Sequence, residues 1–203
     1  MSNTNHGSDK VLSEKVNRAN GLLERGKTDE AVAILNEAVL ANPNDEDVRY
    51  NLGIALARQG NSDEAIKQYE EALRIFPDYI EAHNNLGNLL SRLGRLDDAA
   101  KHFEAAAKAM PDYAPAYNNL GLVFQRQGRT NEALGQFQKA VKLNPQYWEA
   151  HFNLGNSYLA ASHFDDAREE LRTVIRLRPD FRPAQAALTN LEAVAAVRPP
   201  SKP

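Results

Sequence analysis

The chain has 203 residues, of which 42% are hydrophobic, and its 24 basic and 27 acidic residues give a formal net charge of −3. This balance argues against a broad nucleic-acid interface, which requires a basic face. The absence of cysteine excludes disulfides and thiolate metal sites. The polar N-terminus is unlike a secretory signal, and no apolar run has the roughly 18 residues of a membrane span. We therefore expect a cytoplasmic protein with no membrane insertion and no nucleic-acid partner.

Residues 1–11 are polar and aperiodic, and we expect them to form a disordered tail. Beyond them, prolines recur every 34 residues, at Pro43, Pro77, Pro111, Pro145 and Pro179. A period of 20–50 residues is typical of solenoids and repeat arrays. The spacing predicts a repeat domain over 12–197, made of repeats 12–45, 46–79, 80–113, 114–147 and 148–181 and a capping helix over 182–197. The proline-rich residues 198–203 are expected to form a flexible tail.

Each repeat is predicted to contain two helices, A and B. Helix A ends at position 15 with a glycine that can adopt a left-handed conformation, except in the fifth repeat: Gly26, Gly60, Gly94 and Gly128. A second glycine recurs at position 8, in the middle of helix A: Gly53, Gly87, Gly121 and Gly155. Glycine inside a helix costs about 1 kcal/mol relative to alanine. Its regular recurrence therefore predicts that helix B approaches here too closely to admit a Cβ atom.

This pattern resembles the tetratricopeptide repeat (TPR) family, which has leucine–glycine at positions 7 and 8, alanine at 20, an aromatic residue at 24 and proline at 32. The resemblance covers 12–181. It implies an all-α fold, a right-handed α-solenoid of five helix-turn-helix repeats, that serves as a protein-binding scaffold or adaptor. Position 4, normally aromatic in the family, here holds Lys15, Arg49, His83, Tyr117 and His151. This departure bears on how strongly the first helices pack, and not on the fold.

At 100° per residue, positions 2, 5, 6, 9, 12 and 13 of helix A lie opposite the face that packs on helix B. In the resembled family this side lines a concave peptide-binding groove. Asparagine occupies position 6 in every repeat and recurs at positions 5 and 9, although it is a mediocre helix former. We expect a peptide-binding asparagine ladder formed by Asn17, Asn20, Asn51, Asn84, Asn85, Asn88, Asn118, Asn119, Asn153 and Asn156.

An asparagine amide both donates and accepts, so it can pair with the backbone of an extended ligand of any sequence. Helices pack 8–10 Å apart and an extended chain advances about 3.3 Å per residue, so one asparagine would meet about every third ligand residue. The row resembles the asparagine ladder in the repeat domain of O-linked N-acetylglucosamine transferase, which binds substrate backbones. The alternative is that these amides bond the adjacent repeat or only solvate the face.

Two further residue types mark this face. Arginine at position 13, as Arg58, Arg92 and Arg126, is expected to hold acidic side chains of a partner, although arginine near a helix C-terminus also suits the helix dipole. The aromatic residues at position 5, Tyr50 and Phe152, are candidate anchors for a peptide, unless they only contact neighbouring side chains.

The sequence contains no enzyme signature. None of the five histidines has the i, i+4 histidine partner of a helical metal site, and no phosphate loop or nucleophile elbow occurs. We expect no catalytic activity, metal or cofactor. The alternative to a peptide-binding scaffold is a structural protein that self-associates through its ends or its groove. Light scattering across a range of concentrations distinguishes a monomeric adaptor from such an assembly.

Overall fold

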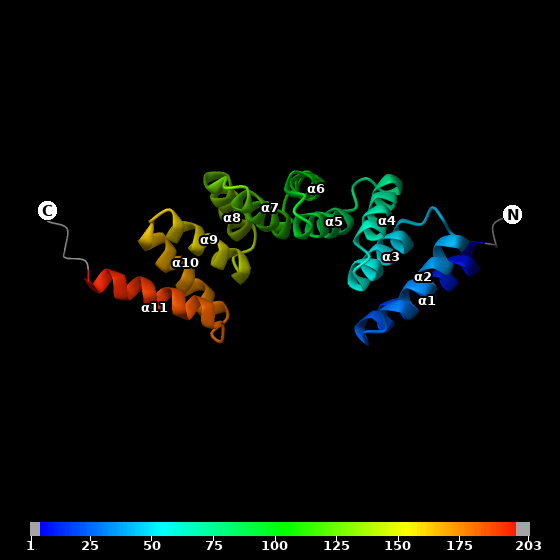
Figure 1. Cartoon of the computed structure of the whole chain (residues 1–203), viewed down its shortest axis with the longest axis horizontal. Coiled ribbons are helices and arrows are strands. Elements are labelled where there is room, and N and C mark those ends of the chain that lie inside the picture. Colours follow the sequence, from blue (N-terminus) through cyan, green and yellow to red (C-terminus); the bar gives the residue numbers. More distant parts are fainter. Residues whose placement is uncertain (1–4, 198–203) are drawn as a thin grey trace. The chain divides into compact units, whose positions relative to one another are not determined.

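The computed structural model describes the backbone of residues 5–197 and the side chains of residues 11–193. Over this range the chain forms eleven α-helices and no β-strand (Figure 1), which confirms the predicted all-α solenoid class. The helices are α1 (Asn5–Glu24), α2 (Thr28–Ala41), α3 (Glu46–Gln59), α4 (Ser62–Ile75), α5 (Ile80–Arg92), α6 (Leu96–Ala109), α7 (Ala114–Arg126), α8 (Thr130–Leu143), α9 (Trp148–Ala160), α10 (Phe164–Leu177) and α11 (Arg182–Val197).

The chain divides after Ala109 into two compact units. Unit 1 contains α1 to α6 and unit 2 contains α7 to α11, and within each unit every helix packs against the next one in sequence. Odd-numbered helices up to α9 are the predicted helices A, and even-numbered helices are helices B. Helix α11 packs on α10 and buries Ala184 and Leu191. None of the helices between residues 5 and 197 is long and apolar enough to cross a membrane.

Helix α1 begins earlier than the sequence predicts. The tail expected to be disordered spans residues 1–11, whereas α1 starts at Asn5, so the expectation is wrong for residues 5–11. These residues lack the apolar periodicity from which a helix is predicted. Extending an existing helix nevertheless costs far less than nucleating one, because each added residue closes one more hydrogen bond. Residues 1–4 and the expected flexible tail, 198–203, lie outside the described residues.

The mid-helix glycines mark the closest contacts between helices A and B. In three repeats a Cβ atom on the glycine would lie 2.6–2.8 Å from the aromatic ring at position 24, in the pairs Gly53–Tyr69, Gly87–Phe103 and Gly121–Phe137. In the fifth repeat, where Leu171 replaces the ring, the nearest atom to a Cβ on Gly155 would be 3.4 Å away. The predicted close approach is therefore confirmed for three repeats, and Gly155 has room for a methyl group.

The turn between helices A and B requires a left-handed residue in every repeat. The four turn glycines have φ between 73° and 88°, as predicted. In the fifth repeat Ser162 has a φ of 61°, so the geometry is retained although the glycine is absent. A residue with a Cβ atom adopts this conformation at a cost of about 1–2 kcal/mol, and the fifth repeat therefore carries local strain.

Replacing Ser162 by glycine is expected to stabilise unit 2 by about 0.5–1 kcal/mol, because the relief of strain exceeds the greater chain entropy that glycine loses on folding. Urea unfolding followed by the fluorescence of Trp148, the single tryptophan of the chain, measures the change. The reciprocal variant, Gly128→Ala, should destabilise the same unit by about 1–2 kcal/mol. A loss of stability in Ser162→Gly would show that the serine side chain makes a necessary contact.

From the second repeat on, the residues at position 4 share one structural role. Each donates a hydrogen bond to the carbonyl oxygen of the proline six residues earlier, just beyond the end of the preceding helix B, where backbone carbonyls lack helical partners. The distances are 2.6–3.2 Å, in the pairs Arg49–Pro43, His83–Pro77, Tyr117–Pro111, His151–Pro145 and, in α11, Gln185–Pro179. Polar side chains at position 4 thus connect α3, α5, α7, α9 and α11 to the loops that precede them.

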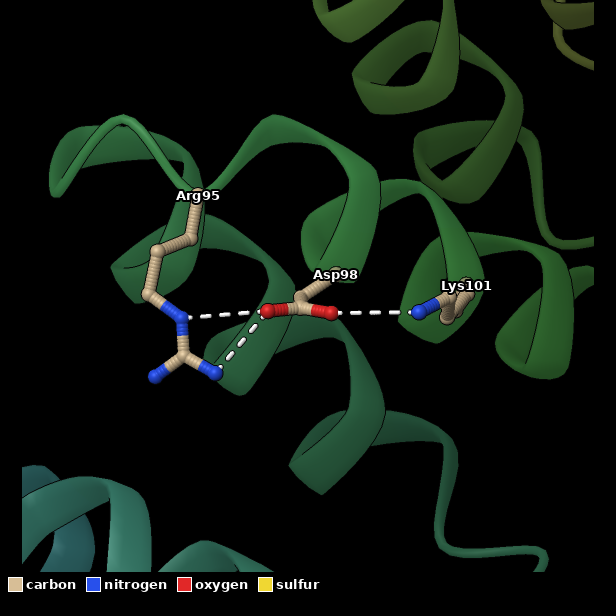
Figure 2. Close-up of polar contacts among 3 residues, drawn as sticks. All are labelled: Arg95, Asp98 and Lys101. Carbon is tan, nitrogen blue, oxygen red and sulfur yellow. Dashed lines mark hydrogen bonds and ion pairs between the residues drawn. The ribbon is translucent and has the colours of Figure 1, made fainter.

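Acidic residues occupy the first turn of several helices B, where the helix dipole favours negative charge. In α6 the carboxylate of Asp98 contacts Arg95 at 2.9 Å and Lys101 at 3.2 Å (Figure 2). Hydrogen bonds from these two side chains hold the pKa of Asp98 below its usual value. Because all three side chains are exposed, these ion pairs add little to the stability of the fold.

Candidate functional site

The predicted groove residues differ in exposure. Those that are exposed are Asn17, Arg58, Asn88, Arg92 and Arg126, whereas Asn118 is buried. Half-buried side chains make up the remainder: Asn20, Tyr50, Asn51, Asn84, Asn85, Asn119, Phe152, Asn153 and Asn156. Helix A therefore presents the asparagine row at the boundary between its packed face and solvent, where amide groups have access to both.

Two position-6 asparagines bond the preceding repeat. In unit 1, Nδ2 of Asn85 donates to the hydroxyl of Tyr50 at 2.9 Å. In unit 2, Nδ2 of Asn153 donates to Oδ1 of Asn118 at 2.8 Å. Both bonds connect position 6 with position 5 of the repeat before it. The row thus takes part in stacking one repeat on the next, through side chains and not through the backbone. Each bond uses one N–H of an amide that has two N–H donors and an accepting oxygen.

Other members of the row bond within their own helix. Nδ2 of Asn51 donates to the backbone oxygen of Asp47 at 2.7 Å. Nδ2 of Asn118 donates to Oδ1 of Asn119 at 3.3 Å. Asn118 also bonds the hydroxyl of Tyr147, the residue just before α9. Burial raises the pKa of this hydroxyl to about 12. Asn118 is only 4% exposed, so it supports its neighbours in unit 2 and offers little surface to a ligand.

A cavity in unit 1 brings four of the predicted residues together. It has a volume of about 600 Å³ and lies between α3 and α5, with α4 beneath. Its walls include Arg58 from α3 and Asn85, Asn88 and Arg92 from α5. Among the described residues that line it, two are basic and none is acidic. The cavity therefore has a positive rim and amide groups on one wall.

Tyr69 of α4 contributes an additional polar group to this cavity. Its side chain is 2% exposed, and its ring packs on Gly53. Burial raises the pKa of the Tyr69 hydroxyl strongly, Tyr50 raises it further, and Arg92 and Arg58 act in the opposite direction. The two arginines are therefore close enough to influence this hydroxyl, which stays protonated and can donate a hydrogen bond at neutral pH.

A second hollow in unit 1 has the opposite charge. It has a volume of about 250 Å³, lies between α1 and α3, and contains Asn51 from the predicted row together with Asp45 and Asp47. Asp47 already accepts a hydrogen bond from the hydroxyl of Tyr79 at 2.6 Å. Asn17 and Asn20 of α1 are not among the residues that line this hollow. The cavity between α3 and α5 therefore brings together four of the predicted residues, and the hollow between α1 and α3 contains one.

The two candidate anchors have aromatic partners inside their own units. The ring of Tyr50 lies 4.9 Å from the ring of Tyr79 and 6.1 Å from that of Tyr69, between centroids. Phe152 meets Phe181 edge to face at 5.0 Å and belongs to the partly buried cluster around α10 and α11. Contacts with neighbouring side chains thus account for both rings, and their role as ligand anchors stays a prediction.

An unforeseen pair joins His83 of α5 to His102 of α6, with the two Nδ1 atoms 2.9 Å apart. Because Nε2 of His83 lies 2.9 Å from the Pro77 carbonyl oxygen, which can only accept, neutral His83 carries its proton on Nε2 and accepts from His102. Burial and the nearby His83 lower the pKa of His102 to about 4. No three His, Cys, Asp or Glu side chains in the described part of the chain come together as a metal-binding group.

Tyr69 was not among the residues predicted from the sequence, because position 24 is a packing position in every repeat. The signal was nevertheless present, since the other repeats hold Leu35, Phe103, Phe137 and Leu171 at this position, and none of these has a polar atom in its side chain. The hydroxyl of Tyr50 was likewise not predicted as a partner of Asn85, because a bond between successive repeats depends on the offset between neighbouring helices A.

Three models of one family, each described as tetratricopeptide repeat, match residues 16–80, 78–146 and 124–191. No curated protein sequence matches the chain. Among solved structures, MamA (41-end) from Desulfovibrio magneticus RS-1 is 28% identical, with a TM-score of 0.73 over 84% of this chain and 96% of that one. The Pseudomonas aeruginosa pilF protein is 21% identical, with a TM-score of 0.78 over 95% of each chain. YrrB, described as a TPR protein with an unusual peptide-binding site, is 24% identical, with a TM-score of 0.69 over 89% of this chain and 96% of that one.

Proposed function

We propose that this chain, which belongs to the tetratricopeptide repeat family, is a protein-interaction scaffold or adaptor that binds an extended segment of a partner along its helices A. The observation that supports this most is the cavity between α3 and α5, where amide and guanidinium groups from two successive helices A converge. Hydrogen-bonding groups that line an open hollow at such a spacing suit a ligand that runs from one repeat to the next.

The amide groups of the row would pair with the backbone of the partner segment, as in the asparagine ladder of the resembled transferase. The bond from Asn85 to Tyr50 is compatible with this task, because it uses one of two N–H donors and leaves the amide oxygen as an acceptor. A side chain that is already held in place also loses less conformational entropy when a ligand binds. Bonds between repeats would thus orient the amides for the partner.

The arginines would favour partners with acidic side chains. Arg58 and Arg92 are exposed at the rim of the cavity, and Arg126 is exposed on α7 in unit 2. Guanidinium groups bind carboxylates through paired N–H donors, and long-range attraction also speeds the encounter with an acidic segment. We therefore expect binding to weaken as the salt concentration rises.

A double substitution tests the asparagine row. A peptide selected for binding to the full chain from a display library would be titrated against the Asn85→Ala/Asn119→Ala variant. We expect the affinity to fall about tenfold, because two ligand hydrogen bonds of roughly 0.5–1.5 kcal/mol each are lost. The free energy of unfolding should fall by no more than about 1 kcal/mol, since the better helix propensity of alanine offsets part of the lost bond to Tyr50.

The matched control is Asn36→Ala/Asn131→Ala, which makes the same two changes in the same two units at exposed positions of α2 and α8. This variant should bind the selected peptide as the unchanged protein does. If the groove variant keeps full affinity while its unfolding free energy falls by several kcal/mol, the row serves repeat stacking alone and the proposal is wrong.

A further inference from the structure

The cavity between α3 and α5 contains the hydroxyl of Tyr69, a group that no other repeat has at position 24. Packing does not require a tyrosine here, because a Cβ atom added to the facing glycine would lie 2.8 Å from Phe103 and 2.6 Å from Phe137, compared with 2.7 Å from Tyr69. The hydroxyl therefore adds nothing that the helix contact needs. It adds a hydrogen-bond donor to a cavity that is lined by two arginines.

The charges around the cavity favour an anion. Arg58 and Arg92 occupy the same repeat position in successive helices A and both line the cavity, and no acidic residue lies among the described residues that line it. Nη1 of Arg58 donates a long hydrogen bond of 3.4 Å to the Leu23 carbonyl oxygen. This bond uses one of the five N–H donors of the guanidinium group. Both arginines thus retain N–H donors toward a group placed between them.

We propose that Arg58, Arg92 and the hydroxyl of Tyr69 form a subsite for one carboxylate side chain, glutamate or aspartate, of the partner segment. This inference rests on the proposed function, and it specifies which ligand group enters unit 1 and which residue determines the specificity. The two guanidinium groups would flank the carboxylate, and the phenol would donate to it from the floor of the cavity. Asn85 and Asn88, on the same wall, are placed to hold the adjoining ligand backbone.

The position of the subsite follows from the sequence difference between repeats. Position 13 is arginine in the second, third and fourth repeats, but tyrosine stands at position 24 only in the second. Two arginines and a phenol can therefore meet only where α4 packs beneath α3 and α5. A buried phenol with a strongly raised pKa remains a neutral donor, so it binds a carboxylate without the repulsion that a phenolate would cause.

The test uses two terminally blocked hexapeptides, one with two central glutamates and one with two central glutamines, added to the full chain. NMR signals of the Nε–H groups of Arg58 and Arg92 report on the subsite. We expect these signals to shift saturably with the glutamate peptide and not with the glutamine peptide. Tyr69→Phe should weaken binding of the glutamate peptide about tenfold, which corresponds to the loss of one hydrogen bond to a charged group. Its fold should be unchanged, because phenylalanine already occupies this position in two repeats.

The control Arg176→Gln removes the same charge from an exposed position of α10, a helix B of unit 2, and should change the affinity less than twofold, whereas Arg58→Gln and Arg92→Gln should each reduce it more than tenfold. Unchanged affinity in Tyr69→Phe, or equal losses in all three arginine variants, would overturn the subsite. A peptide with phosphoserine that binds where the glutamate peptide does not would also overturn it. In each of these cases, continued binding of a library-selected peptide that depends on Asn85 and Asn119 would leave the proposed function standing.

Discussion

Replacing Gly121 by alanine is expected to reduce the stability of unit 2 by about 2 kcal/mol. A Cβ atom at this position would lie 2.6 Å from Cε1 of Phe137, a ring that is completely buried and has no room to withdraw. Overpacking of this kind costs about 1–3 kcal/mol. The approach of 2.6 Å to a buried ring places the cost at the upper end of this range, and the higher helix propensity of alanine, worth about 1 kcal/mol, reduces the net loss to about 2 kcal/mol. Urea unfolding monitored by Trp148 fluorescence measures the result.

Gly135 provides the matched comparison. It lies inside helix α8 of the same unit, and a Cβ atom there would have no neighbour within 4 Å. Gly135→Ala should therefore stabilise the unit by about 1 kcal/mol, which is the propensity difference alone. The same substitution in two helices of one unit thus has opposite expected signs. If Gly121→Ala also stabilised unit 2, the mid-helix glycine would not be required by the approach of helix B.

Acidification from pH 7 to pH 5 is expected to destabilise unit 1 by about 2 kcal/mol through His102. Burial and the neighbouring His83 lower the pKa of His102 to about 4, whereas an unfolded histidine titrates near 6.5. Between these values the unfolded chain binds a proton at His102 that the folded chain does not. The contribution of His102 to the free energy of unfolding is therefore fully present above about pH 6.5 and is lost as the pH falls toward 4.

The matched variant for this prediction is His102→Gln, because glutamine occupies the same repeat position as Gln68 and Gln136. A glutamine at this position can bond a polar side chain on the facing helix A, because Oε1 of Gln68 accepts a hydrogen bond from Arg49 at 2.9 Å. The variant should lose about 2 kcal/mol less stability between pH 7 and pH 5 than the unchanged chain, as measured by urea unfolding followed by circular dichroism. An identical pH dependence in both proteins would show that His102 is not the titrating group.

The repeat architecture could be predicted from the sequence because the relevant signals recur in one register. Proline every 34 residues sets the period, and glycine at position 15 sets the turn, whose left-handed geometry is retained even at Ser162. Glycine at position 8 predicted the contact with helix B in three repeats. The start of α1 was placed too late, since a polar extension of a helix leaves no periodic signal in the sequence.

The candidate site could be predicted only in part. The face of helix A follows from helical periodicity, and four predicted residues do line one cavity. Which atom an asparagine amide bonds depends instead on the offset between neighbouring helices, so the bond from Asn85 to Tyr50 could not be foreseen. The contact between His83 and His102 was missed for the same reason, because the two residues are 19 positions apart on different helices.

The binding face of helix A is tested most directly by the NMR signals of the asparagine side-chain amides. A peptide selected on the full chain would be added, and the NH₂ signals of Asn85 and Asn119 would be compared with those of Asn36 and Asn131 on helices B. We expect the signals of Asn85 and Asn119 to shift saturably with the peptide and those of Asn36 and Asn131 to stay unchanged. Shifts at Asn36 and Asn131 with unchanged signals for Asn85 and Asn119 would contradict this expectation, because the partner would then lie on helices B.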